Sequence, residues 1–429
     1  MDEAWDTSVA WSWINLGKFG NPTYPCDGLE KVFFLHPPLP IILEAFLVKF
    51  FGIGPIVIRF WPVFFGISGI ILFYLLIKNL FGSSIALTST FLLAVNPLYF
   101  LMSRQMRPEI FVTFFTILSL YFIFLNQKKK KYIFLFLAGI FSSLAFLSHF
   151  YGGFIIGAIF LYLLCQIIQH KNKFQDLAIF SLGVLITVLP YFIWVIRNFE
   201  VFKIQFFGNV SNLTGIKSFL SNVFRVKERY LVFPEALCVI LFTFFSLTIF
   251  LKRIWRRFPL IILYFIVFLL GLTLFMPNKT ALYFTPILPV TALVGGLLIQ
   301  EEVNIFNHRL IKVGFKLVGI MFFASSIIYT FTFTVSRGYF SGIGCERLLN
   351  QFNGLIEKNY KTGKIVGDPT YFLFLPGNLK KEFISEHALF RWINEKGVAG
   401  LQNIFCLLYT SDAADEGLGA DLGGRRIIQ

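Results

Sequence analysis

The stretch SRQMRPE, residues Ser103–Glu109, is polar and lies between two apolar segments, PLYFLM before it and IFVTFFTILSLYFIFL after it. Two arginines and a glutamate are concentrated in this stretch, whereas the flanking segments carry no charge. An apolar segment of about 20 residues can cross the hydrocarbon core of a bilayer as a helix. The stretch therefore predicts a loop at a membrane boundary between two spanning helices.

The composition extends this pattern over most of the chain. Hydrophobic residues make up 56% of the 429 residues and charged residues only 14%, whereas a soluble globular protein carries about a quarter charged residues. The 57 phenylalanines exceed what a single soluble core needs. We therefore expect an all-α polytopic membrane protein and exclude a large soluble α/β enzyme.

About ten apolar segments are predicted to span the membrane as helices, because backbone amides in lipid must be hydrogen-bonded within the segment. None of them alternates as the strands of a β-barrel do. The predicted spans are Ile56–Ile77, Ser84–Met102, Ile110–Leu125, Tyr132–Ser148, Gly153–Ile168, Leu177–Ile196, Leu237–Leu251, Leu260–Met276, Tyr283–Ile299 and Val313–Val335. A shorter apolar segment, Leu39–Gly52, contains Glu44 and Lys49 and is expected to lie at the interface.

Every second connection between the predicted spans is rich in lysine and arginine, as at Lys128–Lys131 and Lys252–Arg257. This is the positive-inside pattern, which places these connections in the cytoplasm. It also accounts for the net charge of +15, so we expect no nucleic-acid partner. The N-terminal segment, Ser103–Glu109 and the residues after Val335 are then expected on the extracytoplasmic side.

The domain boundaries follow from these changes in composition. We expect a first extracytoplasmic loop with interfacial helices over 1–54, the helical bundle over 55–335, a partial extracytoplasmic α/β domain over 336–405 and a non-native tail over 406–429. In the α/β domain, Lys364–Pro369 is predicted to form a strand and turn, Tyr371–Leu375 is a second apolar run, and Glu382–Asn394 has helical composition. The Gly-, Ala- and Asp-rich tail resembles translated adapter sequence, and the alternative is a flexible acidic tail.

Acidic and basic residues at the extracytoplasmic boundary are candidates for chemistry. Asp2 and Glu3 precede an aromatic segment, and a carboxylate there could accept a proton from an acceptor hydroxyl. A purely solvated acidic pair is the alternative. Arg104 and Arg107 are not explained by the positive-inside pattern and suit bidentate phosphate contact, although they could also extend to lipid headgroups. Glu109 follows Pro108 at a helix start, where a capping role is the alternative.

Four further residues are expected at the same depth in the membrane. His36 precedes two prolines, Arg59 lies just inside a span, and Lys279 and Tyr283 come from another outward turn. Together they would form a cationic ring suited to a phosphate group. His149 ends a span on this side, but a buried structural histidine is an equally good interpretation.

The order of these motifs resembles that of one enzyme family. After Asp2-Glu3 come HPPLPIILEAFLVKFFG at 36–52, IRFWPVFFGISG at 58–69 with Arg59, and NPLYFLMSRQMRPEIF at 96–111. This series is similar to the dolichyl-phosphate-mannose protein mannosyltransferase superfamily, which belongs to the GT-C fold group with the lipid A aminoarabinose transferases. The likeness covers about residues 1–335 and is strongest before Leu125.

The resemblance implies a glycosyltransferase that moves a sugar, with inversion, from a polyprenyl-phosphate donor to a protein, lipid or glycan hydroxyl on the extracytoplasmic face. By position, Asp2 matches the catalytic acid of the first outer loop, Glu3 its partner, and Glu109 the acidic residue of the second outer loop. His36, Arg59 and Arg104 match residues near the donor phosphate, and Lys279 replaces an expected arginine. No cofactor and no metal are expected.

One departure from the family is large. Its members have a membrane helix before the Asp-Glu pair, whereas Met1 directly precedes Asp2 here. We therefore expect the native protein to extend beyond both ends of this chain.

A transporter or flippase of lipid-linked material is the competing interpretation. Transporters usually carry ionisable groups or broken helices near the middle of the bilayer. In this sequence the charges lie at the ends of the apolar segments, which favours an enzyme acting at the membrane surface. A membrane scaffold without activity would leave the outward arginines and acids unexplained.

Overall fold

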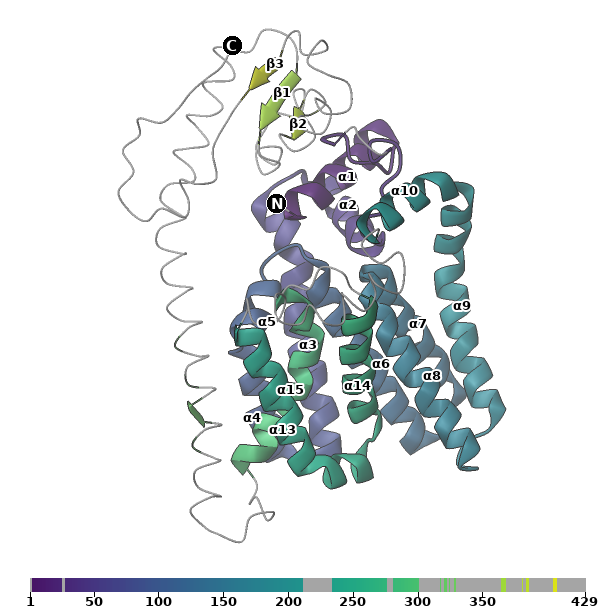
Figure 1. Ribbon diagram of the computed structural model, residues 1–429, viewed down its shortest axis with the longest axis vertical. Helices are drawn as coiled ribbons and strands as arrows, with labels where there is room; N and C mark the ends of the chain where they lie inside the picture. Colours follow the sequence, from purple (N-terminus) through teal and green to yellow (C-terminus); the bar gives the residue numbers. More distant parts are fainter. Residues whose placement is uncertain are drawn as a thin grey trace.

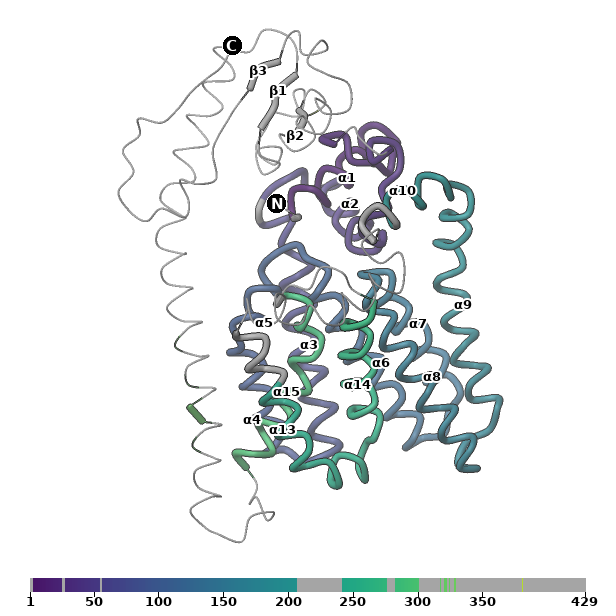
Figure 2. Tube along the Cα trace, viewed as in Figure 1, coloured from purple at the N-terminus to yellow at the C-terminus, as the bar shows by residue number. Residues whose placement is uncertain are grey.

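The chain folds into a bundle of apolar helices, and the helices over Asp2–Leu16, Leu39–Phe51 and Phe199–Val210 lie at one end of it (Figure 1). The computed structural model describes residues 2–24, 28–210, 234–275, 281–300, 364–367, 383–385 and 404–406, together with single positions at 317, 320, 321, 324, 328 and 380. Figure 2 follows the same path along the Cα trace, with the N-terminal helices in purple and the later bundle helices in green.

The helices follow closely on one another along the chain. They are α1 Asp2–Leu16, α2 Leu39–Phe51, α3 Pro55–Phe81, α4 Ser83–Ala94, α5 Pro97–Met102, α6 Pro108–Lys129, α7 Tyr132–Ser148, α8 Gly153–Ile168, α9 Phe174–Arg197, α10 Phe199–Val210, α13 Pro234–Arg257, α14 Leu260–Phe275 and α15 Leu288–Gln300, with 3-10 turns η1 Phe150–Gly152 and η3 Ala281–Ile287. The segment Leu39–Gly52, which is predicted to lie at the interface, forms helix α2 over Leu39–Phe51.

Five described segments are long and apolar enough to cross a membrane, which confirms a multi-pass membrane protein. They are Ile56–Phe81, Pro108–Lys129, Phe150–Ile168, Phe174–Arg197 and Leu282–Gln300. Helices α4, α7 and α14 are apolar but shorter. The predicted span Leu237–Leu251 lies within α13, and most of Val313–Val335 lies outside the described residues.

The prediction of one continuous helix over Ser84–Met102 is wrong. The helix ends at Ala94, and α5 starts again at Pro97. The Asn96 side chain caps α5, because its Oδ1 accepts hydrogen bonds from Leu98 N at 3.0 Å and Tyr99 N at 3.1 Å. Pro97 cannot donate to the preceding turn, which suits it to a helix start and ends the previous helix.

Two helices form the centre of the bundle. The apolar windows of Pro108–Lys129 and Leu282–Gln300 are 78% and 83% buried, whereas that of Phe174–Arg197 is only 28% buried. The exposed side of α9 is apolar and includes Leu185, Leu189 and Ile196. A large exposed apolar surface on a soluble protein would be unfavourable, so this side of α9 suits contact with lipid tails.

Glycines allow α7 and α9 to approach closely. A Cβ added to Gly139 would lie 2.3 Å from Phe180 O, and one added to Gly183 would lie 2.3 Å from Phe136 O. Small residues at such crossings let helix backbones pack tightly where lipid supplies no hydrophobic driving force.

Gly139→Ala is expected to lower the thermal stability of the purified protein. The added methyl group would meet a backbone carbonyl rather than a flexible side chain, so the helices must separate at a cost of about 1–3 kcal/mol. Differential scanning fluorimetry in detergent measures this as a lower Tm. Gly157→Ala is the matched control, because its Cβ would come no closer than 3.9 Å to Val267 Cγ1. Equal Tm values for the two variants would contradict the close approach.

Short strands lie in the C-terminal part. β1 Lys364–Gly367 pairs in parallel with β2 Phe383–Ser385 and with β3 Ile404–Cys406. β1 lies where a strand and turn were predicted, and β2 lies within Glu382–Asn394, the segment of helical composition. Tyr371–Leu375 and residues 407–429 lie outside the described residues.

Candidate functional site

The first turn of α1 is joined to two other parts of the chain by Glu3. Its Oε1 and Oε2 accept hydrogen bonds from Arg59 Nε at 3.0 Å and Arg59 Nη2 at 3.1 Å. Oε1 also accepts from Met106 N at 3.0 Å. Glu3 therefore connects α1 to the start of α3 and to the loop before α6. A bidentate arginine–carboxylate pair is strong and fixes its geometry.

A second carboxylate of α1, Asp6, is paired with His36. His36 Nδ1 lies 2.9 Å from Asp6 Oδ1, and the Asp6 side chain is only 2% exposed. His36 precedes Pro37 and Pro38, which restrict the backbone of this segment. A carboxylate at this distance orients the imidazole ring. The pair thus holds His36 in place beside α1.

Glu44 is a third, fully buried carboxyl group between α1 and α2. Thr7 Oγ1 donates a hydrogen bond to Glu44 Oε1. The same hydroxyl oxygen lies 2.7 Å from the backbone oxygen of Glu3. Glu44 Oε2 is buried without a hydrogen-bond partner. Burial raises the pKa of Glu44 well above its usual value of 4.5, and the nearby charges of Asp6 and Glu3 raise it further. A neutral carboxylic acid at this position follows from these causes.

A buried ion pair lies at the start of α6. Arg107 Nε donates to Glu109 Oε2 at 3.2 Å, and Arg107 Nη2 donates to Glu109 Oε1 at 3.0 Å. The Glu109 side chain is completely buried and that of Arg107 is 18% exposed. The backbone conformation here follows from Pro108, which takes the first position of α6.

Aromatic side chains line the same end of the bundle. The His149 ring stacks on Tyr151 with 4.0 Å between centroids, and Tyr283 of η3 lies 5.5 Å from His149 and 5.2 Å from Tyr151. The ring centroids of His36 and His149 are 6.1 Å apart. Burial lowers the pKa of His149, and the nearby charges of His36 and Arg107 lower it further. The imidazole of His149 is therefore neutral, which favours a structural role.

The structure brings together most of the residues predicted from the sequence. Glu3, His36, Arg59, Arg107, Glu109 and Tyr283 all lie at this end of the bundle. Arg104 is exposed, and its guanidinium lies 5.1 Å from the centroid of the Phe100 ring. Asp2 is the first residue of α1, but its side chain is outside the described part of the structure, as is Lys279.

Asp6, Glu44 and Tyr151 were not identified as site residues from the sequence. Asp6 lies one helical turn after Asp2, so the helical period could have indicated it. Glu44 is a single acid in an apolar helix, which is a signal for a buried polar role. Tyr151 has no such signal, because its burial depends on the packing of η1 against α7 and α14.

Glu3, Arg59, Arg107 and Glu109, together with Asp6 and His36, form a charged layer in which the carboxylates of Asp6 and Glu109 are buried and the cations are partly exposed. Fixed charges in a poorly solvated site act more strongly on a reacting group than they would in water. Among the described residues, no group of three or more His, Cys, Asp or Glu side chains could hold a metal ion. The arrangement suits the binding of an anionic group close to carboxylates that can accept a proton.

Glu44→Gln is expected to reduce the dependence of stability on pH. Because the pKa of Glu44 is raised, the folded protein keeps a proton that the unfolded chain releases above 4.5. Folding stability therefore falls as pH rises from 4.5 toward the raised pKa, and glutamine removes this component. The Tm of wild type should drop more than that of the variant between about pH 5 and about pH 8. Glu200→Gln, at an exposed position, serves as control, and parallel Tm curves for wild type and Glu44→Gln would contradict the assignment.

Comparison with known proteins agrees with the resemblance seen in the sequence. Residues 35–194 match the family described as dolichyl-phosphate-mannose-protein mannosyltransferase. An uncharacterized protein of Aquifex aeolicus is 26% identical over 313 residues, which are 70% of this chain and 59% of the relative. The chain thus spans less than two thirds of the length of this relative.

The fold is shared with solved membrane proteins. ArnT from Cupriavidus metallidurans in the apo state matches with a TM-score of 0.56 and 14% identity, over 92% of this chain and 86% of ArnT. ArnT bound to undecaprenyl phosphate matches with a TM-score of 0.58 and 12% identity, over 92% and 84%. An oligosaccharyltransferase of Archaeoglobus fulgidus matches with a TM-score of 0.51 and 16% identity, over 90% and 58%.

The sequence match covers His36, Arg59, Arg104, Arg107 and Glu109, and the fold match covers nearly all of the chain. The predicted helical membrane bundle is confirmed, and the family resemblance agrees with the match over residues 35–194. Residues 35–194 of the chain thus match the dolichyl-phosphate-mannose-protein mannosyltransferase family, within a helical membrane bundle that shares the fold of ArnT.

Proposed function

We propose that this protein transfers a sugar from a polyprenyl-phosphate donor to an acceptor hydroxyl at the extracytoplasmic boundary of the membrane. The observation that carries the proposal is the layer of paired charges formed by α1, the start of α3 and the start of α6. This layer lies at the end of the bundle opposite the lysine-rich connections. A related fold is seen with undecaprenyl phosphate bound in ArnT, which supports a donor of this chemical class.

The donor phosphate is proposed to lie among His36, Arg59, Arg104, Arg107, Lys279 and Tyr283. Arg59 is 48% exposed and pairs with Glu3 through its Nε and Nη2 atoms. His36 is oriented by Asp6 at the same depth. The polyprenyl tail would lie along apolar helix surfaces, where burial of each CH2 contributes about 0.8 kcal/mol.

The reaction breaks the bond between the anomeric carbon and the phosphate oxygen, and the electron pair stays on the phosphate. The anomeric carbon gains oxocarbenium character. Nearby cations stabilise the growing negative charge on the leaving group. The acceptor oxygen attacks from the opposite face, which inverts the anomeric centre, and a carboxylate takes its proton. We assign this base role to Asp2, with Glu3 and Glu109 holding the surrounding charges in position.

A direct test uses purified protein in detergent with a sugar-labelled polyprenyl monophosphate donor. Cleavage should release labelled sugar, or transfer it to an added acceptor, and leave free polyprenyl phosphate. A polyprenyl pyrophosphate donor carrying the same sugar is the control and should not be cleaved. A panel of hexose and pentose donors identifies the sugar. A flippase would move the intact donor between the leaflets of a vesicle without cleaving it, and that result would refute the transferase proposal.

A further inference from the structure

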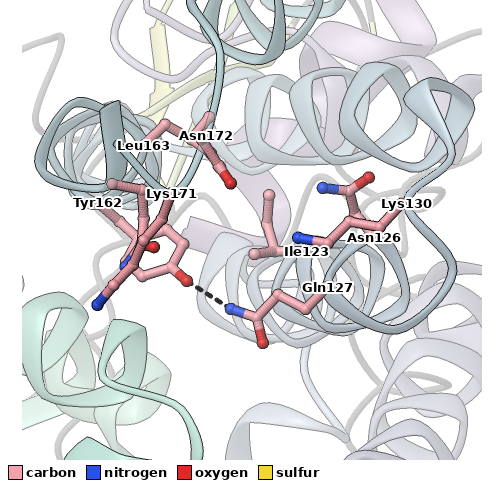
Figure 3. A pocket seen from close by; sticks show the side chains of 9 residues that line it. Ile123, Asn126, Gln127, Lys130, Tyr162, Leu163, Lys171 and Asn172 are labelled. Carbon is pink, nitrogen blue, oxygen red and sulfur yellow. Dashed lines mark hydrogen bonds between the residues drawn. The ribbon is translucent and has the colours of Figure 1, made fainter. Parts of the chain in front are cut away.

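A separate pocket lies at the lysine-rich end of the bundle, far along α6 from the charged layer at its start. It encloses about 300 Å³ and is lined by the end of α6, by α8 and by the loop before α9. The lining residues are Ile123, Asn126, Gln127, Lys130, Tyr162, Leu163, Gln166, Lys171 and Asn172. Figure 3 shows Asn126 and Lys130 on one side, with Lys171 and Asn172 across from them.

The lining combines apolar side chains with cationic and amide groups and is free of carboxylates. It includes two lysines and four side-chain amides, but no aspartate or glutamate. The acidic residue of the adjoining helix, Asp176, accepts a hydrogen bond from Lys173 N and caps α9 instead. Ammonium and amide N–H groups are donors that suit the oxygens of an anion.

The pocket has a defined shape. Gln127 Nε2 donates a hydrogen bond to Tyr162 Oη, which joins α6 to α8 across its floor (Figure 3). Lys130 adopts a left-handed conformation with φ of 51°, and its N–H bonds to Asn126 O, which ends α6 there. Lys171 N and Asn172 N both bond to Gln166 O, which fixes the loop. These backbone contacts fix where the Lys130 and Lys171 side chains begin, and Lys171 Nζ donates a hydrogen bond to Gln169 Oε1 at 2.8 Å.

The neighbouring lysines make different contacts. Lys128 Nζ lies 4.9 Å from the centroid of the Phe124 ring and 3.3 Å from Asn79 Oδ1. Lys129 Nζ lies 5.8 Å from the centroid of Phe134. Neither residue lines the pocket. Two lysines of the same basic run thus act outside the pocket, which provides a matched comparison for Lys130 and Lys171.

The surroundings indicate where the anion comes from. Exposed apolar side chains of α8, such as Leu161 at 42% and Ile168 at 69% exposure, lie on the helix that forms one wall. A site at a helix end beside a lipid-facing surface lies at headgroup depth, and basic pockets between membrane helices on the cytoplasmic side suit phosphate headgroups. We propose that this pocket binds the phosphate of an anionic phospholipid headgroup in the cytoplasmic leaflet, independently of the transferase site.

The test measures lipid retention on the full chain by native mass spectrometry after purification. Phosphatidylglycerol should be retained more than phosphatidylcholine, because only its headgroup keeps a net negative charge. Lys130→Gln combined with Lys171→Gln should weaken phosphatidylglycerol binding by about tenfold or more. Lys128→Gln combined with Lys129→Gln removes the same charge and should weaken it less than about twofold.

Three outcomes decide the proposal. Equal loss of phosphatidylglycerol in the two double variants would overturn it, because the attraction would then depend on charge alone. Equal retention of phosphatidylglycerol and phosphatidylcholine by wild type would also overturn it. Displacement of the lipid by millimolar inorganic phosphate would support a phosphate site but overturn the lipid as its occupant. Circular dichroism and Tm of each variant confirm folding before binding is compared.

Discussion

Asp2→Asn should reduce sugar transfer by about 10²–10⁴-fold while leaving donor binding intact. Asparagine has nearly the same shape as aspartate but cannot accept the proton of the acceptor hydroxyl. The effect should therefore appear in kcat, with the affinity for the polyprenyl-phosphate donor unchanged. Turnover of labelled donor and equilibrium binding of unlabelled polyprenyl phosphate separate the two quantities. Near-native turnover in this variant would exclude Asp2 as the base.

Asp6→Asn is the matched comparison, because Asp6 lies on the same helix and is paired with His36. Its loss should release the His36 ring and weaken the hold on the donor phosphate. We expect a higher KM with a smaller change in kcat, as for a positioning residue. If Asp6→Asn abolished turnover with donor affinity unchanged, the base role would belong to Asp6 and the assignment to Asp2 would be wrong.

Arg107→Ala should destabilise the protein by about 3–5 kcal/mol. Glu109 is fully buried and bound by two hydrogen bonds from Arg107, so the substitution leaves a buried carboxylate without its cation. Chemical denaturation in detergent, or Tm, measures the loss. Adding Glu109→Gln to the variant should recover part of the stability, because the buried charge is then removed.

Arg104→Ala is the control for this prediction. It lies three positions earlier in the same loop and is exposed, and its guanidinium lies over the Phe100 ring. An exposed cation–π contact contributes about 0.5–1 kcal/mol. Similar losses for Arg104→Ala and Arg107→Ala would show that the buried pair is not the reason for the effect.

The helical bundle could be predicted from the sequence because apolar length alone constrains a membrane helix. The end of α4 was not predicted, because the apolar run continues past it. Asn96 and Pro97 together do carry the signal of a helix end followed by the cap of a new helix. The composition around residues 383–385 favours a helix, whereas in the structure these residues pair with β1 as a strand. Pairing between segments distant in sequence is not visible in local composition.

The candidate site was predictable in its charged members and not in their partners. Polar residues in apolar surroundings, such as Arg107 and Glu109, are conspicuous in the sequence. Which acid pairs with which base depends on how α1 lies on the bundle. From the sequence, Glu3 was interpreted as a partner of Asp2, whereas in the structure it pairs with Arg59. Asp6 was overlooked for the same reason, since its partner His36 is 30 positions away.

Gln205 of α10 has a consequence for how the protein is made. Its Oε1 accepts a hydrogen bond from Phe34 N at 2.7 Å, and its Nε2 donates to Val32 O at 2.7 Å. The backbone leading to His36 is thus completed by a residue synthesised about 170 positions later. During translation, the ribosome must release most of the membrane helices before this segment reaches its final shape. The end of the molecule that we propose to bind the donor is therefore expected to reach its final structure late, after the helices of the bundle have been inserted.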